Sequence, residues 1–324
     1  MNFTVHILGT ASALPTTARY PSAQIVDVRG RLFMIDCGEG AQIQIRKAGI
    51  SFLRIEYICL SHIHGDHIFG IFGLLSTMGL LGRKSPLNIF APPEFGPILE
   101  FFKTQFGEGL QFDINFTALE MTEPKLVYEN RRTELLAFPL NHRVNTFGFI
   151  IREKVPQRNV KKDAIEKYDL SLSDIGTLKR GEDVIRETNE NETFVIKNED
   201  VTFYRYIPRS YAYCSDTAPF DKLKDWIKGV DVLYHEATFP IEMTEMAEKT
   251  FHSTTLQAAQ VAKDADVKKL IVGHYSSRFP SVDFYLAEIQ TIFPDVTLAH
   301  DGDVIEIPPA STLTGRFASL PGKM

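Results

Sequence analysis

Short apolar runs recur along the chain, and ionisable or turn-forming residues follow each of them at once. Runs of this kind, rich in β-branched and aromatic side chains, are typical of strands buried in a sheet. We predict five such strands, over residues 55–60, 135–138, 211–214, 230–234 and 269–272. Active sites in layered α/β proteins gather where strands end. We therefore expect the ionisable groups that follow these strands to share one edge.

The segments between these strands carry helix signals. Residues 41–48 are followed by Gly49, and residues 283–293 by Pro294, which are typical residues at helix ends. Thr254 and Gln257 fit a capping box ahead of residues 258–265. Strands that alternate with helices predict an α/β protein with helices outside packed sheets.

The densest cluster of candidate metal ligands follows the first of these strands. His62, His64, Asp66 and His67 lie within six residues, which core packing does not require, because each buried polar group must find a partner. Gly65 is expected to let the backbone turn tightly between them. We predict that the first two histidines bind one metal ion and the last two residues a second. Zinc suits these ligands, manganese is also accepted, and ion pairs ~3.5–4 Å apart are typical of phosphoryl chemistry.

The remaining ligands must come from other strand ends. His142, Asp216 and His274 each follow a predicted strand and are the best candidates. Asp216 has two oxygens with which to bridge both ions. His6, on the first strand, is expected to be a metal-free core histidine, and His300, in a turn, to be structural.

Residues 152–209 break the alternation and are too long for an ordinary connection in a compact domain. Residues 152–186 contain nine Lys and Arg against seven Asp and Glu, whereas the net charge of the whole chain is −6. Charge alone leaves two interpretations open: a surface insertion, or a protruding arm that contacts a polyanion. The acidic residues 187–200 are predicted to form a solvated loop.

The composition narrows the class of protein. With 324 residues, 44% hydrophobic and 23% charged, the chain is typical of a globular protein. The longest uncharged stretch, residues 68–82, is too short to cross a bilayer, and the start lacks a signal peptide. Three widely spaced cysteines favour a reducing cytoplasm over a disulfide scaffold. We therefore expect a cytoplasmic protein without a membrane segment.

The segment His62-Ile63-His64-Gly65-Asp66-His67 is the motif of the metallo-β-lactamase superfamily. With five further segments it resembles ribonuclease Z, the tRNA 3′-processing endonuclease, over residues 3–307. Those segments are Gly9–Pro15, Asp36–Gly40, His235–Phe239, His252–Thr254 and His274–Phe279. The resemblance implies a four-layer αββα sandwich as one catalytic domain over residues 1–307, an inserted flexible exosite arm at 152–209, and a tail at 308–324.

The same resemblance implies a short-form homodimer with two zinc ions per subunit, in which the arm of one subunit holds the precursor tRNA that the other cuts. Removal of the 3′ trailer would leave a 3′-hydroxyl on the tRNA and a 5′-phosphate on the trailer. One zinc would be held by His62, His64 and His142, the other by Asp66, His67 and His274, with Asp216 bridging.

Cleavage also needs a proton for the leaving 3′-oxygen, which the metal-activated water does not supply. A carboxylate beside an imidazole raises the imidazole pKa and makes it a proton donor, so Glu236 and His252 fit this role, with a structural ion pair as the alternative. The resemblance assigns the same role to this pair, and to Asp66 the orientation of the nucleophile. His235 is expected to support the site without binding metal.

Phosphate contacts are expected from the arm and from one residue beside the metal ligand His274. The candidates are Lys161, Lys162, Lys179, Arg180 and Arg278. The arm in this family usually has a Gly-Pro step near its tip, where this chain has Ser173–Thr177, so the resemblance does not fix the tip.

Two other functions compete with this interpretation. A superfamily hydrolase acting on a thioester or a small phosphodiester would share the seven ligands but has no use for the arm or the Glu236/His252 pair. A catalytically silent RNA-binding subunit would be expected to lose ligands, and this chain keeps all seven candidates.

Overall fold

The computed structural model describes residues 2–187 and 192–309, so most of the predicted tail, from residue 310 on, lies outside the described residues. The chain forms two compact units, the first comprising residues 1–153 and 209–307 and the second Lys154–Pro208. No helix within the described ranges is long and apolar enough to cross a membrane.

The first unit is built on two seven-stranded sheets. The first sheet has the order β20-β1-β3-β4-β5-β6-β7, with β1 (Phe3–Gly9), β3 (Ala23–Val28), β4 (Arg31–Cys37), β5 (Ile55–Cys59), β6 (Leu87–Ala91), β7 (Ile114–Ala118) and β20 (Val304–Glu306). The second has the order β19-β17-β16-β15-β10-β9-β8, with β8 (Lys125–Glu129), β9 (Thr133–Pro139), β10 (Phe147–Glu153), β15 (Ser210–Cys214), β16 (Val232–Glu236), β17 (Lys269–Gly273) and β19 (Val296–Leu298). A short pair, β2 (Ala11–Ser12) with β18 (Tyr275–Ser276), joins segments from opposite ends of this unit's sequence.

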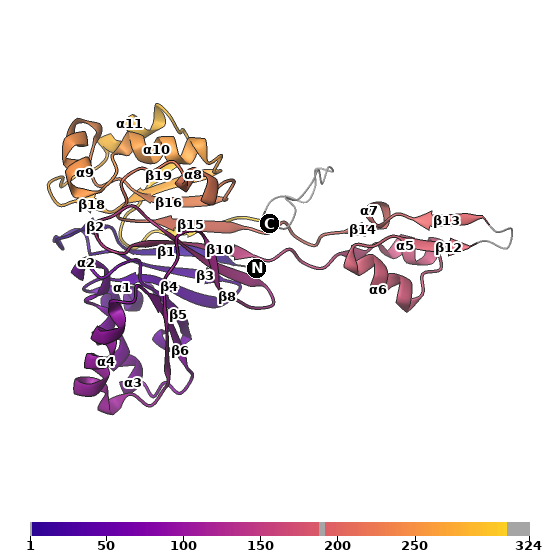
Figure 1. The fold of residues 1–324 in the computed structure, drawn as a ribbon, viewed down its shortest axis with the longest axis horizontal. Coiled ribbons are helices and arrows are strands. Elements are labelled where there is room, and N and C mark those ends of the chain that lie inside the picture. Colours follow the sequence, from indigo (N-terminus) through magenta and orange to yellow (C-terminus); the bar gives the residue numbers. More distant parts are fainter. Residues whose placement is uncertain (1, 188–191, 310–324) are drawn as a thin grey trace. The chain divides into compact units, whose positions relative to one another are not determined.

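Helices cover the outer face of each sheet, which gives four layers (Figure 1). The first sheet carries α1 (Ala41–Lys47), α2 (Gly65–Ile68), α3 (Ile71–Leu80) and α4 (Phe95–Phe106) with 3-10 turns at Phe52–Arg54 and Gly107–Gly109; the second carries α8 (Leu223–Trp226), α9 (Thr244–Thr250), α10 (Thr255–Asp264) and α11 (Phe284–Gln290) with a 3-10 turn at Ile241–Met243. This arrangement confirms the αββα sandwich expected from the resemblance.

The strands read as continuous apolar runs because both of their faces are buried. On β4, Phe33 and Ile35 pack in the core between the two sheets, whereas Met34 packs in the core under the helices. On β15, Tyr213 and Cys214 divide in the same way between the inner core and the second helical layer. Successive side chains of a strand point to opposite faces of the sheet. A strand that is covered on both faces therefore shows no alternation of polar and apolar residues in its sequence.

The five predicted strands correspond to β5, β9, β15, β16 and β17, and the predicted helices to α1, α10 and α11. The capping box is confirmed: the Thr254 side chain accepts a hydrogen bond from the Gln257 N–H, and the Gln257 side chain accepts one from the Thr254 N–H. The third helix is shorter than predicted, since it ends at Gln290.

The second unit has a small core of its own. Leu178, Val184, Ile196 and Val201 are all at most 5% exposed. The helices and strands of this unit are β11 (Asn159–Val160), α5 (Lys162–Lys167), α6 (Leu172–Arg180), β12 (Val184–Glu187), β13 (Thr193–Ile196), α7 (Asn198–Val201) and β14 (Thr202–Phe203). The prediction of a solvated loop over residues 187–200 is wrong for its described part, because β13 and most of α7 lie there and the Ile196 side chain is buried in this core.

Candidate metal centre

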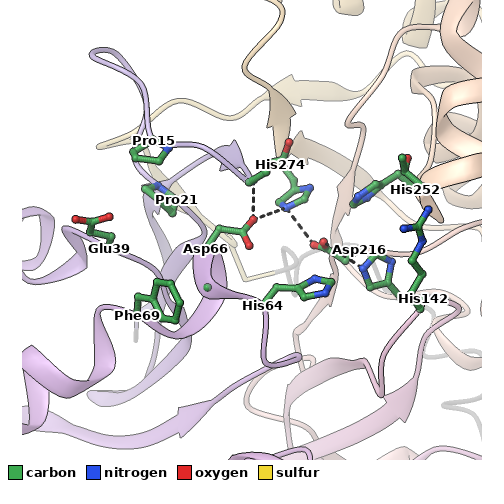
Figure 2. A pocket seen from close by; sticks show the side chains of 15 residues that line it. Pro15, Pro21, Glu39, His64, Asp66, Phe69, His142, Asp216, His252 and His274 are labelled. Carbon is green, nitrogen blue, oxygen red and sulfur yellow. Dashed lines mark hydrogen bonds and ion pairs between the residues drawn. The ribbon is translucent and has the colours of Figure 1, made fainter.

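The candidate ligands come from strand ends of both sheets. His62 and His64 follow β5, and α2 then carries Asp66 and His67. From the second sheet, His142 comes shortly after β9, Asp216 after β15 and His274 directly after β17. In Figure 2 the side chains of His64, Asp66, His142, Asp216 and His274 point toward one another in one pocket. The expectation that residues far apart in the sequence share one edge of the fold is thus met by the geometry.

The seven side chains form two groups that meet at Asp216. Its Oδ2 lies 3.6 Å from His62 Nε2 and 3.9 Å from His142 Nε2. Its Oδ1 lies 3.2 Å from His67 Nε2 and 3.1 Å from His274 Nε2. Ligand atoms of His62, His64, His142 and Asp216 all lie within 4.8 Å of one another, as do those of Asp66, His67 and His274. One oxygen of Asp216 therefore faces each group, as a bridging carboxylate requires.

Two imidazoles turn Nε2 toward the centre because their Nδ1 atoms have partners outside it. His67 Nδ1 lies 2.8 Å from Asp36 Oδ2, and His274 Nδ1 lies 3.0 Å from the Thr238 hydroxyl. The two Nε2 atoms then face each other at 3.3 Å, so one cation can contact both. Outer partners of this kind orient metal-bound histidines.

His142 shows the same pattern more clearly. Its Nδ1–H donates to the Phe251 carbonyl at 2.9 Å. Its Nε2 is buried without a hydrogen-bond partner among the described residues. An orphaned buried acceptor is costly, and a metal ion at the centre would satisfy it. The donor set and this orphaned nitrogen together fit a divalent cation.

The backbone is strained where it delivers these groups. Asp216 and His274 have φ of 57° and 60°, and Asp36 has φ of 56°. The left-handed region costs a residue with a Cβ about 1–2 kcal/mol, and such strain persists where the surroundings impose it. All three residues stand at or just after the end of a strand. The turn directs each side chain out of the sheet and toward the centre.

Gly65 is the first residue of α2, and its φ is not positive. A Cβ atom at this position would lie 2.4 Å from the ring of Phe69. Glycine is needed because that ring packs against the backbone at the start of α2, beside the pocket that it also lines.

The electrostatics of the centre favour a positive charge. Burial alone would raise the pKa of Asp216, but His274, His67 and His62 hold it well below its usual range. Burial lowers the pKa of His62, which leaves it a neutral ligand. At His67 the effect of burial is outweighed by Asp216, Asp66 and Asp36, which raise its pKa. Three carboxylates thus stabilise a cation at this position.

Glu236 and His252 lie at the edge of the centre. Glu236 Oε1 is 2.8 Å from His252 Nδ1 and accepts a hydrogen bond from the Thr217 N–H at 2.7 Å. Thr238 donates from its hydroxyl to the other carboxylate oxygen. Burial would lower the pKa of His252, but the charge and hydrogen bond of Glu236 raise it to about 9. The imidazole is therefore a cation at neutral pH, with Nε2 left to face the pocket.

The pocket over this centre has a volume of about 560 Å³. Its wall includes Arg143 and Phe69, which the sequence interpretation did not single out, although Arg143 directly follows a candidate ligand. Arg278 is not part of this wall; its guanidinium lies near the Ser276 hydroxyl. Its contact with a phosphate stays a prediction.

The other predicted histidines lie outside the groups of described residues that could hold a metal. His6 is only partly buried, and His300 is exposed with Nδ1 3.6 Å from Asp303. His235 is buried and lies outside the groups of described residues that could hold a metal.

Ser173–Thr177, in place of the Gly-Pro step, forms part of α6. The basic candidates of the second unit, Lys161, Lys162, Lys179 and Arg180, are all exposed.

Known proteins resemble the chain over nearly its whole length. Curated proteins named Ribonuclease Z from Bacteroides thetaiotaomicron and Cytophaga hutchinsonii are 42% and 41% identical to it, over 94% and 93% of this chain and 95% of each relative. The crystal structure of human tRNase Z, short form, superimposes with a TM-score of 0.68 at 25% identity, covering 94% of this chain and 99% of that one. A metallo-β-lactamase fold protein from Bacillus subtilis (TM-score 0.66, 17% identity, covering 94% of this chain and all of the other) shares the fold.

One family model, described as Anti-Pycsar protein Apyc1, matches residues 3–155. That segment contains the ligands from His62 to His142. It ends before Asp216, Glu236, His252 and His274. The match therefore covers less than half of the chain and only part of the centre.

We predict that Asp216→Ala lowers the metal content, because the variant lacks the carboxylate that faces both groups. Elemental analysis of the purified variant measures this directly. His6→Asn and His300→Asn, which change histidines away from the centre, serve as controls and should keep the full metal content. Two metals per subunit retained in Asp216→Ala would contradict the bridging arrangement.

Proposed function

Since this chain belongs to the ribonuclease Z family and processes the 3′ end of tRNA, we propose that it cuts with two zinc ions and a Glu236–His252 proton donor. The cut leaves a 3′-hydroxyl on the tRNA and a 5′-phosphate on the trailer. The observation that carries this mechanism is the hydrogen-bonded Glu236–His252 pair beside the bridging Asp216.

The His and Asp side chains of the centre bind divalent metal. We assign His62, His64 and His142 to one ion, Asp66, His67 and His274 to the other, and Asp216 to both, with manganese as a possible substitute for zinc. Two such ions, when bound, supply a water of lowered pKa as nucleophile and positive charge opposite the phosphate in the transition state.

We assign Asp66 to the orientation of the nucleophile. Its Oδ2 accepts a hydrogen bond from the Ala13 N–H at 2.7 Å and lies 3.5 Å and 3.7 Å from His67 and His274 Nε2. The His67 charge and hydrogen bonds from His274 and His67 outweigh burial and hold the pKa of Asp66 far below its usual range. The carboxylate therefore stays an acceptor for a water O–H across the whole working pH range.

His252 supplies the proton that the leaving 3′-oxygen needs. Glu236 fixes the imidazole through Nδ1, so Nε2–H is the group that donates. Because Glu236 is itself held by the Thr217 N–H and the Thr238 hydroxyl, its carboxylate cannot turn away from His252. General acid catalysis of this kind contributes ~10²–10⁴-fold to a rate. A superfamily hydrolase with a better leaving group would have no need of this pair.

We assign residues 152–209 to an exosite arm inserted into a catalytic domain of residues 1–307. Its own core supports a role as an independent binding element. Lys161, Lys162, Lys179 and Arg180 are our candidates for phosphate contacts in the arm, and Arg278 in the catalytic domain. A silent RNA-binding subunit is disfavoured because all seven candidate ligands lie together.

We further propose a cytoplasmic homodimer. The three cysteines are all buried and form no disulfide, which suits a reducing compartment. Exposed apolar side chains on the first helical layer support a subunit interface: Ile43 on α1 is 53% exposed, Phe69 after α2 is 65% exposed, and Leu80 on α3 is 88% exposed. The Thr77 hydroxyl on α3 donates to Gln42 on α1, so these helices are neighbours.

The pH dependence of cleavage tests the proton donor. The acid form of His252 is active and its pKa is about 9, so kcat should fall as the pH rises through about 9. Glu236→Gln removes the charge that raises this pKa, and the fall should then occur at lower pH, toward the ordinary value of ~6.5. Steady-state kcat measured from pH 6 to 10 checks both expectations.

His252→Ala is the companion variant. It should keep both metals and lose ~10²–10⁴-fold in rate on precursor tRNA. The loss should be smaller on a nitrophenyl phosphodiester, whose leaving group needs no proton. Equal losses on the two substrates would show that His252 is not a proton donor.

Deletion of the outer arm tests the exosite. Replacing Lys161–Asp200 with a short Gly/Ser linker should leave hydrolysis of small phosphodiesters near normal and weaken binding of precursor tRNA. The dependence of log affinity on log salt should become shallower by roughly 0.7–0.9 for each phosphate that the arm no longer neutralises. Substituting Lys161, Lys162, Lys179 and Arg180 by Ala, with the fold kept, should reproduce part of the effect. Normal tRNA affinity and salt dependence in the deletion would reduce the arm to a surface insertion.

Mixing two proteins that are each impaired on precursor tRNA tests the dimer. The arm deletion keeps its metal centre, whereas Asp216→Ala keeps its arm. If the arm of one subunit holds the tRNA that its partner cuts, co-expressed heterodimers of the two should regain cleavage of precursor tRNA. Each protein alone is the control. Heterodimers that co-purify without regaining activity would show that each arm serves its own subunit.

A further inference from the structure

Four arginines surround a second cavity in the first unit, at the ends of the strands remote from the metal centre. The cavity has a volume of about 440 Å³ and is lined by Arg29, Arg31, Arg131 and Arg132, with Glu56 the one acidic side chain in its described wall. Val28 is the one large apolar residue among them. A wall of this chemistry suits an anion and offers little to an apolar ligand.

Two tight turns hold the arginines in place. Between β3 and β4, Arg29 and Gly30 have φ of 55° and 87°, and the Gly30 N–H donates to Asp27. Between β8 and β9, the Asn130 side-chain oxygen accepts hydrogen bonds from the N–H groups of Arg132 and Thr133, at 2.8 Å and 3.0 Å. Both turns are fixed by side-chain hydrogen bonds, so the cavity is preformed.

A buried ion-pair cluster holds Arg29, one of the arginines of the cavity wall. Glu153 is 2% exposed, and its Oε1 lies 2.6 Å from Arg29 Nε and 2.9 Å from an Arg209 guanidinium nitrogen. Burial would raise the pKa of Glu153, but hydrogen bonds from Arg209 and Arg29 hold it below its usual value. The carboxylate is thus ionised, and two cations share it.

The local charge is positive in a chain whose net charge is −6. Five guanidinium groups, those of the wall and of Arg209, stand against the carboxylates of Glu56 and Glu153, a net of +3. The charged residues next to the turns are two cations, Arg54 and Arg152, and three anions, Asp27, Glu129 and Glu134. When they are included, the local net charge is +2. Neither Arg131 nor Arg132 has an ion-pair partner among the described residues, so both side chains are available to a ligand.

We propose that this arginine pocket binds the ribose-phosphate backbone of the RNA substrate, at a point away from the cut. The proposal rests on the proposed function. Arg31 begins β4 and Asp36, which contacts the metal ligand His67, lies near its end. Five residue steps at ~3.3 Å put the pocket about 15 Å or more from the centre, so its phosphate is not the one that is cleaved.

The position along the chain favours RNA as the source of the phosphate. Glu153 is the last residue of β10, and the chain leaves the first unit directly after it for the arm. A backbone contact here would add to arm contacts on the same strand of RNA, which gains affinity without requiring a new partner. A free polyphosphate presents the same chemistry and is the alternative that the experiment separates.

The test is the double variant Arg131→Ala/Arg132→Ala, which removes two exposed side chains and keeps the N–H groups that Asn130 binds. Precursor-tRNA affinity, measured by fluorescence anisotropy, should fall at least about tenfold at 0.1 M salt, and the salt slope should become shallower by roughly 1.4–1.8. KM for precursor tRNA should rise while kcat and hydrolysis of a nitrophenyl phosphodiester stay unchanged. Lys224→Ala/Lys228→Ala, two exposed lysines on and beside α8, is the matched control with the same change of charge.

A second arm of the test uses tripolyphosphate, with thermal stabilisation of wild type and double variant compared. If tRNA affinity is unchanged but the variant loses the stabilisation by tripolyphosphate, the pocket serves a free anion and the RNA assignment is overturned. If neither measurement changes, the pocket is not a phosphate site. Because binding is measured apart from cleavage, a wild-type protein that binds tRNA through these arginines but fails to cut it would contradict the proposed function alone.

Discussion

The carboxylate of Asp36 joins the two sheets to the metal centre. It is fully buried, and its oxygens accept hydrogen bonds from the Ser61 N–H, the Ser61 hydroxyl and the Tyr213 hydroxyl, and contact His67 Nδ1 at 2.8 Å. Ser61 follows β5 of the first sheet, and Tyr213 lies on β15 of the second. A buried carboxylate is tolerated only when it is fully paired. The orientation of His67 therefore depends on both sheets being docked.

The sequence predicted the strand ends and the ligands because both depend on local patterns. Apolar runs buried on two faces mark β5 and β15, and the density of histidines after β5 has no explanation in packing. The groups that hold the ligands were harder to find. Thr238 and Phe251 act through a hydroxyl and a carbonyl placed by long-range docking, and no local pattern distinguishes such residues. The steric role of Gly65 could not be predicted for the same reason, since the Phe69 ring that it accommodates is seen only in three dimensions.

The structure of the second unit could not be predicted from its sequence, for a different reason. Its helices are short, and the residues that form its core, such as Leu178 and Ile196, are separated by polar stretches that read as loop. A core this small needs few apolar residues, so its periodicity is weak even though each of them is buried. Composition correctly identified the segment as different from the rest of the chain. It could not reveal that the difference is a small packed unit.

The charges of the centre also bear on the order in which RNA and metal can bind. Asp66, Asp216 and Glu236 lie in or beside one pocket. Glu236 is paired with His252, whereas Asp66 and Asp216 share His67, an imidazole whose pKa is raised. A phosphodiester brought to this pocket without divalent cations would meet a net negative charge at short range, where repulsion is weakly screened. Divalent cations held at this centre would reverse the sign of the local charge. Metal binding would therefore be a condition for seating the phosphate as well as for cleaving it, whereas the RNA contacts that we propose on the arm and at the remote arginines would carry no such requirement. On this proposal, affinity for the body of the tRNA and productive seating of its 3′ end are physically separate.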